Sequence, residues 1–232
     1  MTSPHPIRRN SAVLLETLAV AGKTVVDVGS GDGANARLMA QAGATVIGLE
    51  CQPRQLAKAR AAPPVPGITY LDAGAEAMPL ADSSADIVVF FNSLHHVAPS
   101  QMDRALAEAA RVLTPGGTVF VSEPLAEGDF FEMVRPIEDE TQVRAQAYAA
   151  MRAAHRHGLT MTAESVHRNP VLFKDFAAWR DRVASANPER EAIFDSMDRA
   201  LRDSFDRLGR KTPEGIAFEQ PTRVNLLKKE RG

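Results

Sequence analysis

The sequence predicts an α/β fold in which helices cover both faces of a mainly parallel sheet. From residue 24 onward, short apolar runs alternate with segments of helical periodicity, as in repeated strand, helix, strand units. The run ADIVVFFNS is almost wholly apolar, as a central parallel strand requires. The first run ends in the glycine-rich turn of VVDVGSGDG, directly before a helical segment. We therefore expect a doubly wound sheet.

Local signals predict each element of the first half in turn. An amphipathic helix beginning at Asn10 or Ser11 precedes the first strand, because apolar residues recur there at helical spacing. Pro53 fits the first turn of a helix, and Ser100 with Asp103 fits a capping box. The residues TPGG end that last helix. We expect strands at 24–29, 44–50, 68–73, 85–93 and 117–124, with helices at 34–43, 52–62 and 100–113.

The second half of the chain is less regular. The segment PLAEGDFFEMVRPIEDE is predicted as a loop. A helical pattern over 139–157 ends at Gly158, and an extended run follows over 161–173. After it we expect a helix around Trp179, a helix capped by Asn187 with Pro188 at its first position, and a closing strand at 222–229.

Composition limits the partners and the compartment. Lys plus Arg number 27 against 29 Asp plus Glu, so the net charge of -2 favours neither nucleic acid nor an anionic membrane. Arg8 and Arg9 precede an apolar stretch, but Glu16 interrupts it, which favours a helix over an export signal. The single cysteine, Cys51, rules out an internal disulfide and suits a reducing compartment. We expect a cytoplasmic protein without membrane insertion, and its oligomeric state stays open.

The glycine-rich turn is the first candidate ligand site. Gly29, Gly31 and Ala34 fit the spacing of a dinucleotide site, which leaves an NAD(P)-dependent oxidoreductase open. Asp27, however, lies in the strand two residues before Gly29. A carboxylate there is poorly placed beside a pyrophosphate and well placed for the cationic amino-acid part of a ligand. S-adenosyl-L-methionine carries such an ammonium and no phosphate.

Several motifs occur in an order that is typical of one family. VDVGSGDG comes first, Glu50 ends the second strand, and AEAMPLADSSADIVVFFNSLHHV and RVLTPGGTVFVSE follow. They resemble the motifs of class I S-adenosylmethionine-dependent methyltransferases, particularly the small-molecule branch with the ubiquinone and menaquinone methyltransferases. The resemblance implies a Rossmann-like, doubly wound seven-stranded sheet, mostly parallel with an antiparallel last strand, and added helices. It also implies one domain over 1–232, with a cofactor-binding core at 25–124 and substrate-side additions at 1–22 and 125–215.

The resemblance implies transfer of a methyl group from S-adenosylmethionine to a small organic molecule by direct displacement. A non-catalytic cofactor-binding protein on the same fold stays an alternative, beside the oxidoreductase. The family places an acid such as Glu50 on both ribose hydroxyls. Its usual Asp before the Ala-Glu pair is Gly74 here, so adenine binding falls to Asp72 or to the backbone of Ala75 and Glu76. The candidate cofactor-binding residues are Asp27, Gly29, Ser30, Gly31, Gly33, Glu50, Cys51, Asp72, Ala75, Glu76 and Asn92.

His95 and His96 are the candidate catalytic residues. They follow Asn92 at the end of the fourth strand, and an imidazole titrates near neutral pH, as a base for a phenol or enol must. We expect at most one to face the methyl group, because adjacent residues of an extended segment point opposite ways. No third ligand lies at metal-binding spacing, so we predict no metal site. Glu123 ends the fifth strand and is expected at the same edge of the sheet. Cys51 is expected to fill a small buried gap and not to act as a nucleophile.

Overall fold

The structure, a computed structural model, describes residues 5–186 and 189–231. These residues form two units. The sheet unit carries most of the predicted core, and the appended unit carries much of the predicted range 125–215. The sheet unit comprises Asn10–Glu123, Val143–Ser165 and 223–231, and the appended unit comprises 5–9, Pro124–Gln142 and the described residues of Val166–Thr222.

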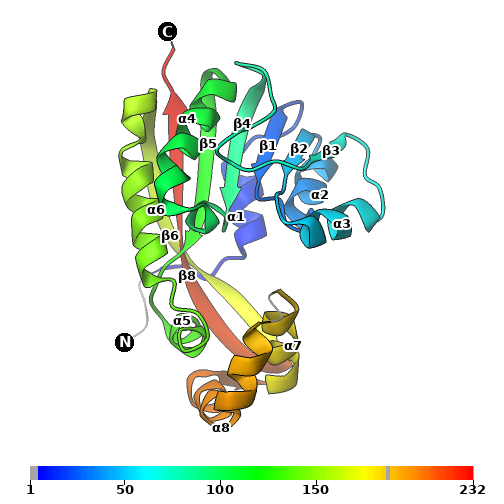
Figure 1. Cartoon of the computed structure of the whole chain (residues 1–232), viewed down its shortest axis with the longest axis vertical. Helices are drawn as coiled ribbons and strands as arrows, with labels where there is room; N and C mark the ends of the chain where they lie inside the picture. Colours follow the sequence, from blue (N-terminus) through cyan, green and yellow to red (C-terminus); the bar gives the residue numbers. More distant parts are fainter. Residues whose placement is uncertain (1–4, 187–188, 232) are drawn as a thin grey trace. The chain divides into compact units, whose positions relative to one another are not determined.

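The strands form one mixed sheet in the order β3-β2-β1-β4-β5-β8-β6, with β7 paired to β8 (Figure 1). Their bounds are β1 Thr24–Val28, β2 Thr45–Leu49, β3 Ile68–Leu71, β4 Ala85–Phe91, β5 Leu113–Pro124, β6 Leu159–Phe173, β7 Arg210–Thr212 and β8 Gly215–Lys229. Strands β1 to β5 pair in parallel. Thr118 bonds Lys228 and Leu125 bonds Pro221, so β8 runs opposite to β5. The predicted mostly parallel sheet with an antiparallel last strand is confirmed. The described sheet has eight strands instead of the predicted seven, because the short β7 adds to β8.

Helices cover both faces of the sheet unit. The bounds are α1 Asn10–Thr17, α2 Ala34–Gln41, α3 Pro53–Ala61, α4 Met102–Val112 and α6 Thr141–Arg152. Alternate residues of β1 face opposite sides, as the pleat requires. Val26 packs in a cluster with Leu106 of α4, whereas Val25 packs in a cluster with Leu14 of α1 and Met39 of α2. The doubly wound arrangement therefore follows from continuous apolar strands that need cover on both sides.

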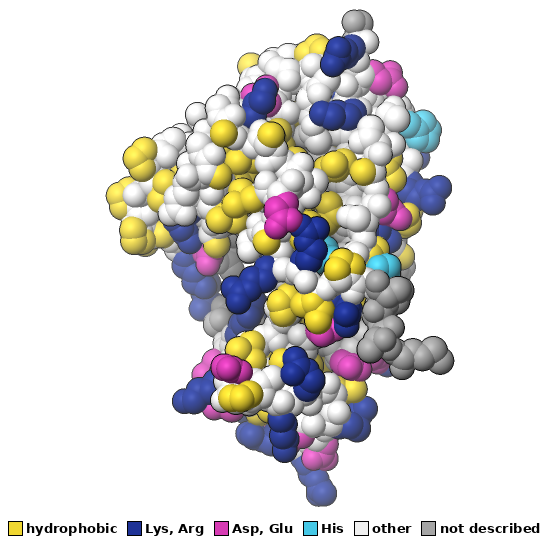
Figure 2. Space-filling model, turned by 180° about the vertical axis from the view of Figure 1, so that it is seen from behind, with side chains coloured by type: hydrophobic (Ala, Val, Ile, Leu, Met, Phe, Trp, Pro, Cys, Tyr) yellow, Lys and Arg dark blue, Asp and Glu magenta, His cyan; other side chains and the backbone are white. Residues whose placement is uncertain are grey.

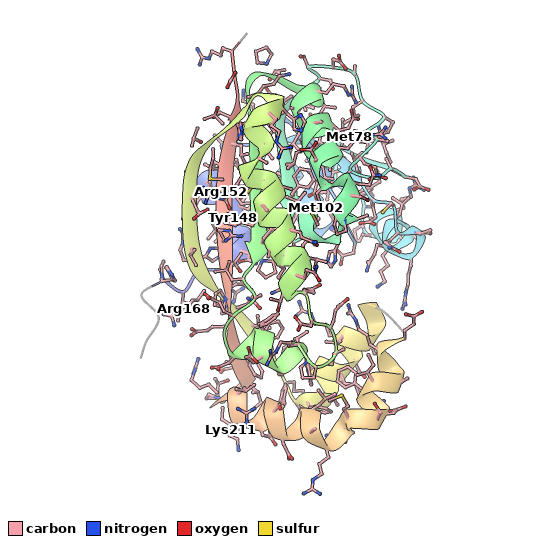
Figure 3. The ribbon with its side chains drawn as sticks, turned by 60° about the vertical axis from the view of Figure 1, so that its left-hand side comes forward. Met78, Met102, Tyr148, Arg152, Arg168 and Lys211 are labelled. Atoms are coloured by element: carbon pink, nitrogen blue, oxygen red, sulfur yellow. The ribbon has the colours of Figure 1, made fainter. Side chains whose placement is uncertain are left out.

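Polar contacts of Tyr148 tie α6 to the antiparallel strands. Tyr148 and Arg152 both belong to α6 (Figure 3). The Tyr148 hydroxyl donates to Glu164 at 2.9 Å, and the Arg223 guanidinium lies 3.4 Å from the centre of the Tyr148 ring. Asn225 of β8 donates to the same Glu164 carboxylate at 2.8 Å. These bonds lower the pKa of Glu164, with the Asn225 bond the largest cause. The carboxylate thereby links β6, β8 and α6.

Two predicted boundaries in the first half are wrong. The capping box of Ser100 and Asp103 does not form: a 3-10 turn, Pro99–Gln101, precedes α4, and no side chain caps the helix. The TPGG residues lie inside β5 instead of before it. The strand starts early because Ala85 already pairs with Leu113, while Ile87 pairs with Thr118. TPGG is therefore the bulged part of a continuous strand.

The appended unit has its own aromatic core. Its helices are α5 Asp129–Val134, α7 Phe176–Ala186 and α8 Arg190–Leu208. Trp179 is fully buried, and its ring lies 5.3 Å from Phe176, 5.1 Å from Phe194 and 5.7 Å from Phe205, measured between ring centroids. Such pairs stabilise a small core beyond their buried area. The predicted helix around Trp179 is confirmed as α7, and the helix predicted after it is confirmed as α8.

Other predictions for the second half had mixed outcomes. The helix over 139–157 is α6 followed by a 3-10 turn, Ala154–His157, which ends at Gly158 in a left-handed conformation, as predicted. The predicted loop after β5 is wrong in part, because α5 forms there with Phe131 and Met133 buried. A run of six residues is too short to show helical periodicity in the sequence. The predicted cap at Asn187 and Pro188 lies outside the described residues.

Surface charge follows the balanced composition. Figure 2 shows positive and negative side chains interspersed over one face of the molecule, in keeping with the net charge of -2. Over 5–186 and 189–231, no helix has the length and apolar character that a membrane crossing needs.

Truncating Leu106 should destabilise the fold strongly. Its side chain is completely buried under α4, so Leu106→Ala removes packed methyl groups and should lower the free energy of unfolding by about 2–5 kcal/mol. Leu172 is 51% exposed, so the matched Leu172→Ala should change the same quantity by less than about 0.5 kcal/mol. Urea denaturation of both variants checks this. Equal losses would contradict the assigned core.

Candidate functional site

Buried polar residues gather where the parallel strands of the sheet unit end. The carboxyl ends of parallel strands meet at one edge of a sheet, and ligands of doubly wound folds bind there. Polar side chains this deeply buried need hydrogen-bond partners or a ligand. The buried polar residues at this edge are Asp27, Ser30, Glu50, Ser93, His95, Ser122 and Glu123.

Asp27 is the most unusual of them. It lies in β1 between Gly48 of β2 and Val89 of β4, with 1% of its surface exposed. Its Oδ2 atom is buried and accepts no hydrogen bond from the described residues. Burial, and then the Glu50 carboxylate, raises the pKa of Asp27 to about 7. A carboxylate in this state is costly, and a donor or cation at Oδ2 would offset that cost.

The glycines after Asp27 are needed for two different reasons. Gly29, Gly31 and Gly33 have φ values of 69°, 57° and 80°, which residues with a side chain rarely adopt. A Cβ on Gly29 would lie 2.7 Å from the Cβ of Ser93, so close packing requires this glycine. A Cβ on Gly31 would meet nothing within 4 Å. Gly31 therefore leaves open space above the turn, as a backbone that approaches a ligand should.

Glu50 holds the turn in place. Its Oε2 accepts a hydrogen bond from the Gly31 amide at 2.7 Å, and its Oε1 accepts one from the Gln52 amide at 2.7 Å. Glu50 is 6% exposed and so is not a solvated strand end. The next residue, Cys51, is exposed, so the predicted buried gap is wrong. Burial by neighbouring atoms and the Glu50 carboxylate raise the pKa of the Cys51 thiol, which disfavours a thiolate.

The segment after β3 departs from the expectation for adenine. Asp72 is exposed, and Ala75 is buried. The Glu76 carboxylate folds back over Gly74: a Cβ built there would lie 2.5 Å from Oε1 and 2.6 Å from Oε2 of Glu76. Glu76 thus fills the space in which a side chain at position 74 would start. The Glu76 carboxylate therefore lies beside position 74, where the family's usual acid would start.

Asn92 ends β4 in a strained conformation. Its φ of 53° is uncommon for a residue other than glycine, and such strain concentrates at functional sites. Its amide donates to the Ser122 carbonyl at 2.7 Å, while its Oδ1 is buried without a described hydrogen-bond partner. The hydroxyls of Ser30 and Ser122 are likewise buried without a partner among the described residues. Ser93 Oγ donates to the Val28 carbonyl at 2.6 Å and so joins β4 to β1.

The two histidines do not lie on an extended segment, which was the premise for expecting their rings to point apart. They belong to a 3-10 turn, η1, Leu94–His96, and their ring centroids are 4.0 Å apart. His95 is buried and His96 is exposed. Glu123 accepts a hydrogen bond from the Leu94 amide at 2.9 Å through Oε1, and its Oε2 contacts Nδ1 of His95. The structure therefore separates the two histidines by burial.

Arg111 anchors the loop that follows the Glu76 segment. Its guanidinium donates to both carboxylate oxygens of Glu108, to Asp82, and to the carbonyls of Met78 and Leu80. Glu108 in turn accepts from the Met78 amide at 2.9 Å. These bonds lower the pKa of Glu108, with the Arg111 bond the largest cause. One side chain at the end of α4 thus fixes the course of the loop.

The structure thus groups most of the predicted site residues at one edge. Asp27, the glycine turn and Glu50 are joined through backbone bonds, and Asn92 with His95 follows the adjacent strand. Asp72 and Cys51, in contrast, are exposed, and their predicted roles in cofactor binding stay predictions. Ser93, Ser122 and Arg111 were not predicted from the sequence, although a serine at a strand end was a usable signal for the first two.

The comparison with protein families identifies the core of the sheet unit. The family described as methyltransferase domain matches residues 26–121. These residues resemble a methyltransferase domain. An uncharacterised methyltransferase of Synechocystis is 38% identical to the chain over 104 residues, which cover 44% of the chain and 48% of that protein. The demethylmenaquinone methyltransferase of Tropheryma whipplei is 38% identical over 104 residues, which cover 44% of the chain and 42% of that protein.

Solved structures confirm the Rossmann-like fold of the methyltransferase domain and its surroundings. The YcgJ protein of Bacillus subtilis has a TM-score of 0.67 at 20% identity, covering 96% of the chain and 98% of that protein. The [4+2]-cyclase SpnF has a TM-score of 0.65 at 20% identity, covering 96% and 81%. At such identity the likeness concerns the fold alone. The chain spans about half the length of the first curated relatives it matches, at 48%, 45% and 53% of their lengths.

The buried Asp27 should make the stability of the ligand-free protein fall with rising pH. Its folded pKa of about 7 exceeds its ordinary value of 3.8, so the folded state binds the proton more tightly. The stability contribution is therefore present below about pH 4 and is lost as the pH rises to about 7. Between about pH 5 and about pH 8 the loss should be about 2–3 kcal/mol.

Asp27→Asn should remove this part of the pH dependence, and urea denaturation at the two pH values measures it. Asp32→Asn is the matched control, because the Asp32 side chain is exposed on the same turn. The same pH dependence in Asp27→Asn as in the wild type would contradict the assigned burial of a titrating carboxyl.

Proposed function

We propose that the chain is an S-adenosylmethionine-dependent methyltransferase that acts on a small organic molecule. The observation that carries the proposal is the buried Oδ2 of Asp27 at the end of β1, inside the matched residues 26–121, which accepts no hydrogen bond from the part of the chain that the structure describes. The ligand's ammonium is the partner that this carboxylate lacks. A diphosphate in the same place would add negative charge beside a buried acid, which disfavours the NAD(P) alternative.

The residues around Asp27 fit the other parts of S-adenosylmethionine. Open space above Gly31 accommodates a ligand close to the backbone. Each carboxylate oxygen of Glu50 accepts one amide hydrogen bond and can accept a second one. The two oxygens therefore suit the two ribose hydroxyls. Glu76, held over Gly74, is our candidate for the adenine amino group in preference to exposed Asp72. The buried Oδ1 of Asn92 is a further acceptor for the amino-acid end.

Once bound, S-adenosylmethionine supplies a methyl group that is activated by its sulfonium. The work of the chain is to orient the acceptor and to exclude water, and such positioning contributes on the order of 7–11 kcal/mol in favourable cases. His95 and His96 are the candidate groups for removing a proton from the acceptor. The acceptor as a small molecule, the cytoplasmic location and the absence of nucleic-acid partners stay predictions from the sequence.

Calorimetry with S-adenosylhomocysteine and with NADH tests the proposal. We expect the nucleoside to bind and NADH not to bind. Asp27→Asn should weaken S-adenosylhomocysteine binding at least about 30-fold, since a buried charge loses its partner. Binding by the wild type should weaken about tenfold for each pH unit below about pH 7, because protonated Asp27 cannot pair with an ammonium. Tight NADH binding without nucleoside binding would favour the oxidoreductase instead.

A methyl group on Gly31 should block the ligand without unfolding the protein. Gly31→Ala introduces strain of about 1–2 kcal/mol at a left-handed position, and the new Cβ occupies the open space. Gly22 is the matched control, because it is also left-handed, with φ 70°, and its Cβ would also meet nothing within 4 Å. Gly31→Ala should lose S-adenosylhomocysteine binding, whereas Gly22→Ala should retain it. Equal affinities would show that the ligand does not approach this turn.

A further inference from the structure

A pocket lies at the amino ends of the central parallel strands, at the edge of the sheet unit opposite the candidate functional site. Its volume is about 460 Å³, within the range of about 300–1,000 Å³ that small-molecule sites occupy. Its lining includes Lys23, which precedes β1, and Ile87, near the start of β4, whereas Asn92 follows the other end of β4. At about 3.3 Å per residue, Ile87 and Asn92 are roughly 16 Å apart. The pocket is therefore separate from the proposed cofactor site.

The bulge in β5 forms one wall of this pocket. Residues 114–117, the TPGG motif, have Asp86 opposite them in β4, and all four line the pocket. Gly116 has a φ of 77°, a left-handed conformation that glycine favours. A Cβ on Gly117 would lie 2.9 Å from the carbonyl oxygen of Thr114. The shape of this wall therefore requires both glycines.

Apolar side chains form another part of the lining. Leu18 follows α1, Ile87 lies in β4, and Leu226 lies in β8. They pack in one cluster, in which Leu18 and Ile87 are buried and Leu226 is partly buried. The exposed Ala19 also lines the pocket. The pocket therefore offers an apolar surface that a ligand can remove from water.

Lys228 of β8 brings a positive charge to the pocket. Its ammonium donates to Oγ1 of Thr118 at 2.7 Å and to the carbonyl of Gly116 at 3.4 Å, and both acceptors are neutral. Over residues 5–186 and 189–231, no carboxylate pairs with this ammonium. An ammonium has three N–H donors, so a third bond is available to a ligand. An anionic oxygen would form the strongest bond of this kind.

The remaining charges around the pocket also favour an anion. Oδ1 of Asp86 lies 3.6 Å from Nζ of Lys23, and its Oδ2 accepts from the Thr24 amide at 2.9 Å. The lining thus holds two lysines and one acid. Arg231 lies next to the lining, with its Nε 3.5 Å from a Cβ built on Gly116. Because Asp86 also faces the pocket, a group with one negative charge fits better than a doubly charged phosphate.

We propose that this pocket binds a small organic monocarboxylate. The carboxylate bonds the Lys228 ammonium, and the apolar part of the ligand packs on Leu18 and Leu226. This second site goes beyond the proposed function and does not depend on it. Since the pocket and Asp27 lie at opposite edges of the sheet, the carboxylate and the methyl donor bind together without competing.

The test uses hexanoate as the probe and hexanamide as its neutral counterpart. Each is titrated into the whole chain labelled with 15N, with and without S-adenosylhomocysteine, and the backbone amide shifts are followed by NMR. Lys228→Gln removes the charge, and Ala19→Phe fills the pocket from an exposed position of its lining. Lys229→Gln is the matched control, because the adjacent Lys229 lies outside the lining and donates to the Leu113 carbonyl at 2.7 Å.

We expect hexanoate to bind the wild type with a Kd of about 1 mM or lower and to shift the amides of Gly116 and Gly117. Hexanamide should bind at least about tenfold more weakly, because it lacks the charge-assisted bond. Lys228→Gln should weaken hexanoate binding at least about tenfold, and Ala19→Phe should abolish it. Lys229→Gln should stay within about twofold of the wild type, and S-adenosylhomocysteine should change the hexanoate Kd by less than about threefold.

Wild-type affinity for hexanoate in Lys228→Gln would overturn the proposal, as would equal affinities of the wild type for hexanoate and hexanamide. Shifts confined to residues around Asp27, or displacement of hexanoate by S-adenosylhomocysteine, would place the probe at the candidate functional site instead. Inorganic phosphate is titrated as a third probe. Tighter binding of phosphate than of hexanoate at Gly116 and Gly117 would overturn the ligand class, and binding of none of the three probes would overturn the site.

Discussion

The site is built around a carboxyl group at the end of β1 that is buried with one oxygen unbonded by any residue that the structure describes. Asp27 occupies the middle of a parallel sheet, where both neighbouring strands exclude water. The same burial that raises its pKa to about 7 makes a cation the most favourable partner. A chain selected for stability alone would place an apolar residue there, as it does at Val26 and Val28. The acid is therefore best explained by a ligand.

The surroundings of Asp27 are organised by backbone amides more than by side chains. Glu50 accepts one hydrogen bond from the Gly31 amide and one from the Gln52 amide. The end of β2 therefore holds the glycine turn that follows β1. Ser93 connects the glycine turn to the end of β4, because its hydroxyl donates to the Val28 carbonyl and its side chain packs against Gly29. A turn held in this way presents the same surface before and after a ligand arrives, which lowers the entropy lost on binding.

The fold by itself does not select the reaction. A methyltransferase domain matches the chain, yet a protein described as a cyclase shares the same architecture at similar TM-score. Function must therefore be argued from the site. Here the buried Asp27 and the contact between His95 and Glu123 lie at one edge of the sheet, and our proposal assigns Asp27 to the methyl donor.

The sequence by itself determined the order of strands and helices over the first 124 residues, the glycine turn, and the acids Asp27 and Glu50. These features depend on local periodicity and on residues adjacent in the chain. Only the tertiary structure decided that Glu76 folds over Gly74, that Cys51 is exposed, and that Glu123 meets His95. Those facts depend on which strands pair and where loops turn back, and residues 28 positions apart carry no local sign of contact. Periodicity records which face a residue takes within its own element, whereas burial and hydrogen bonding depend on elements far along the chain.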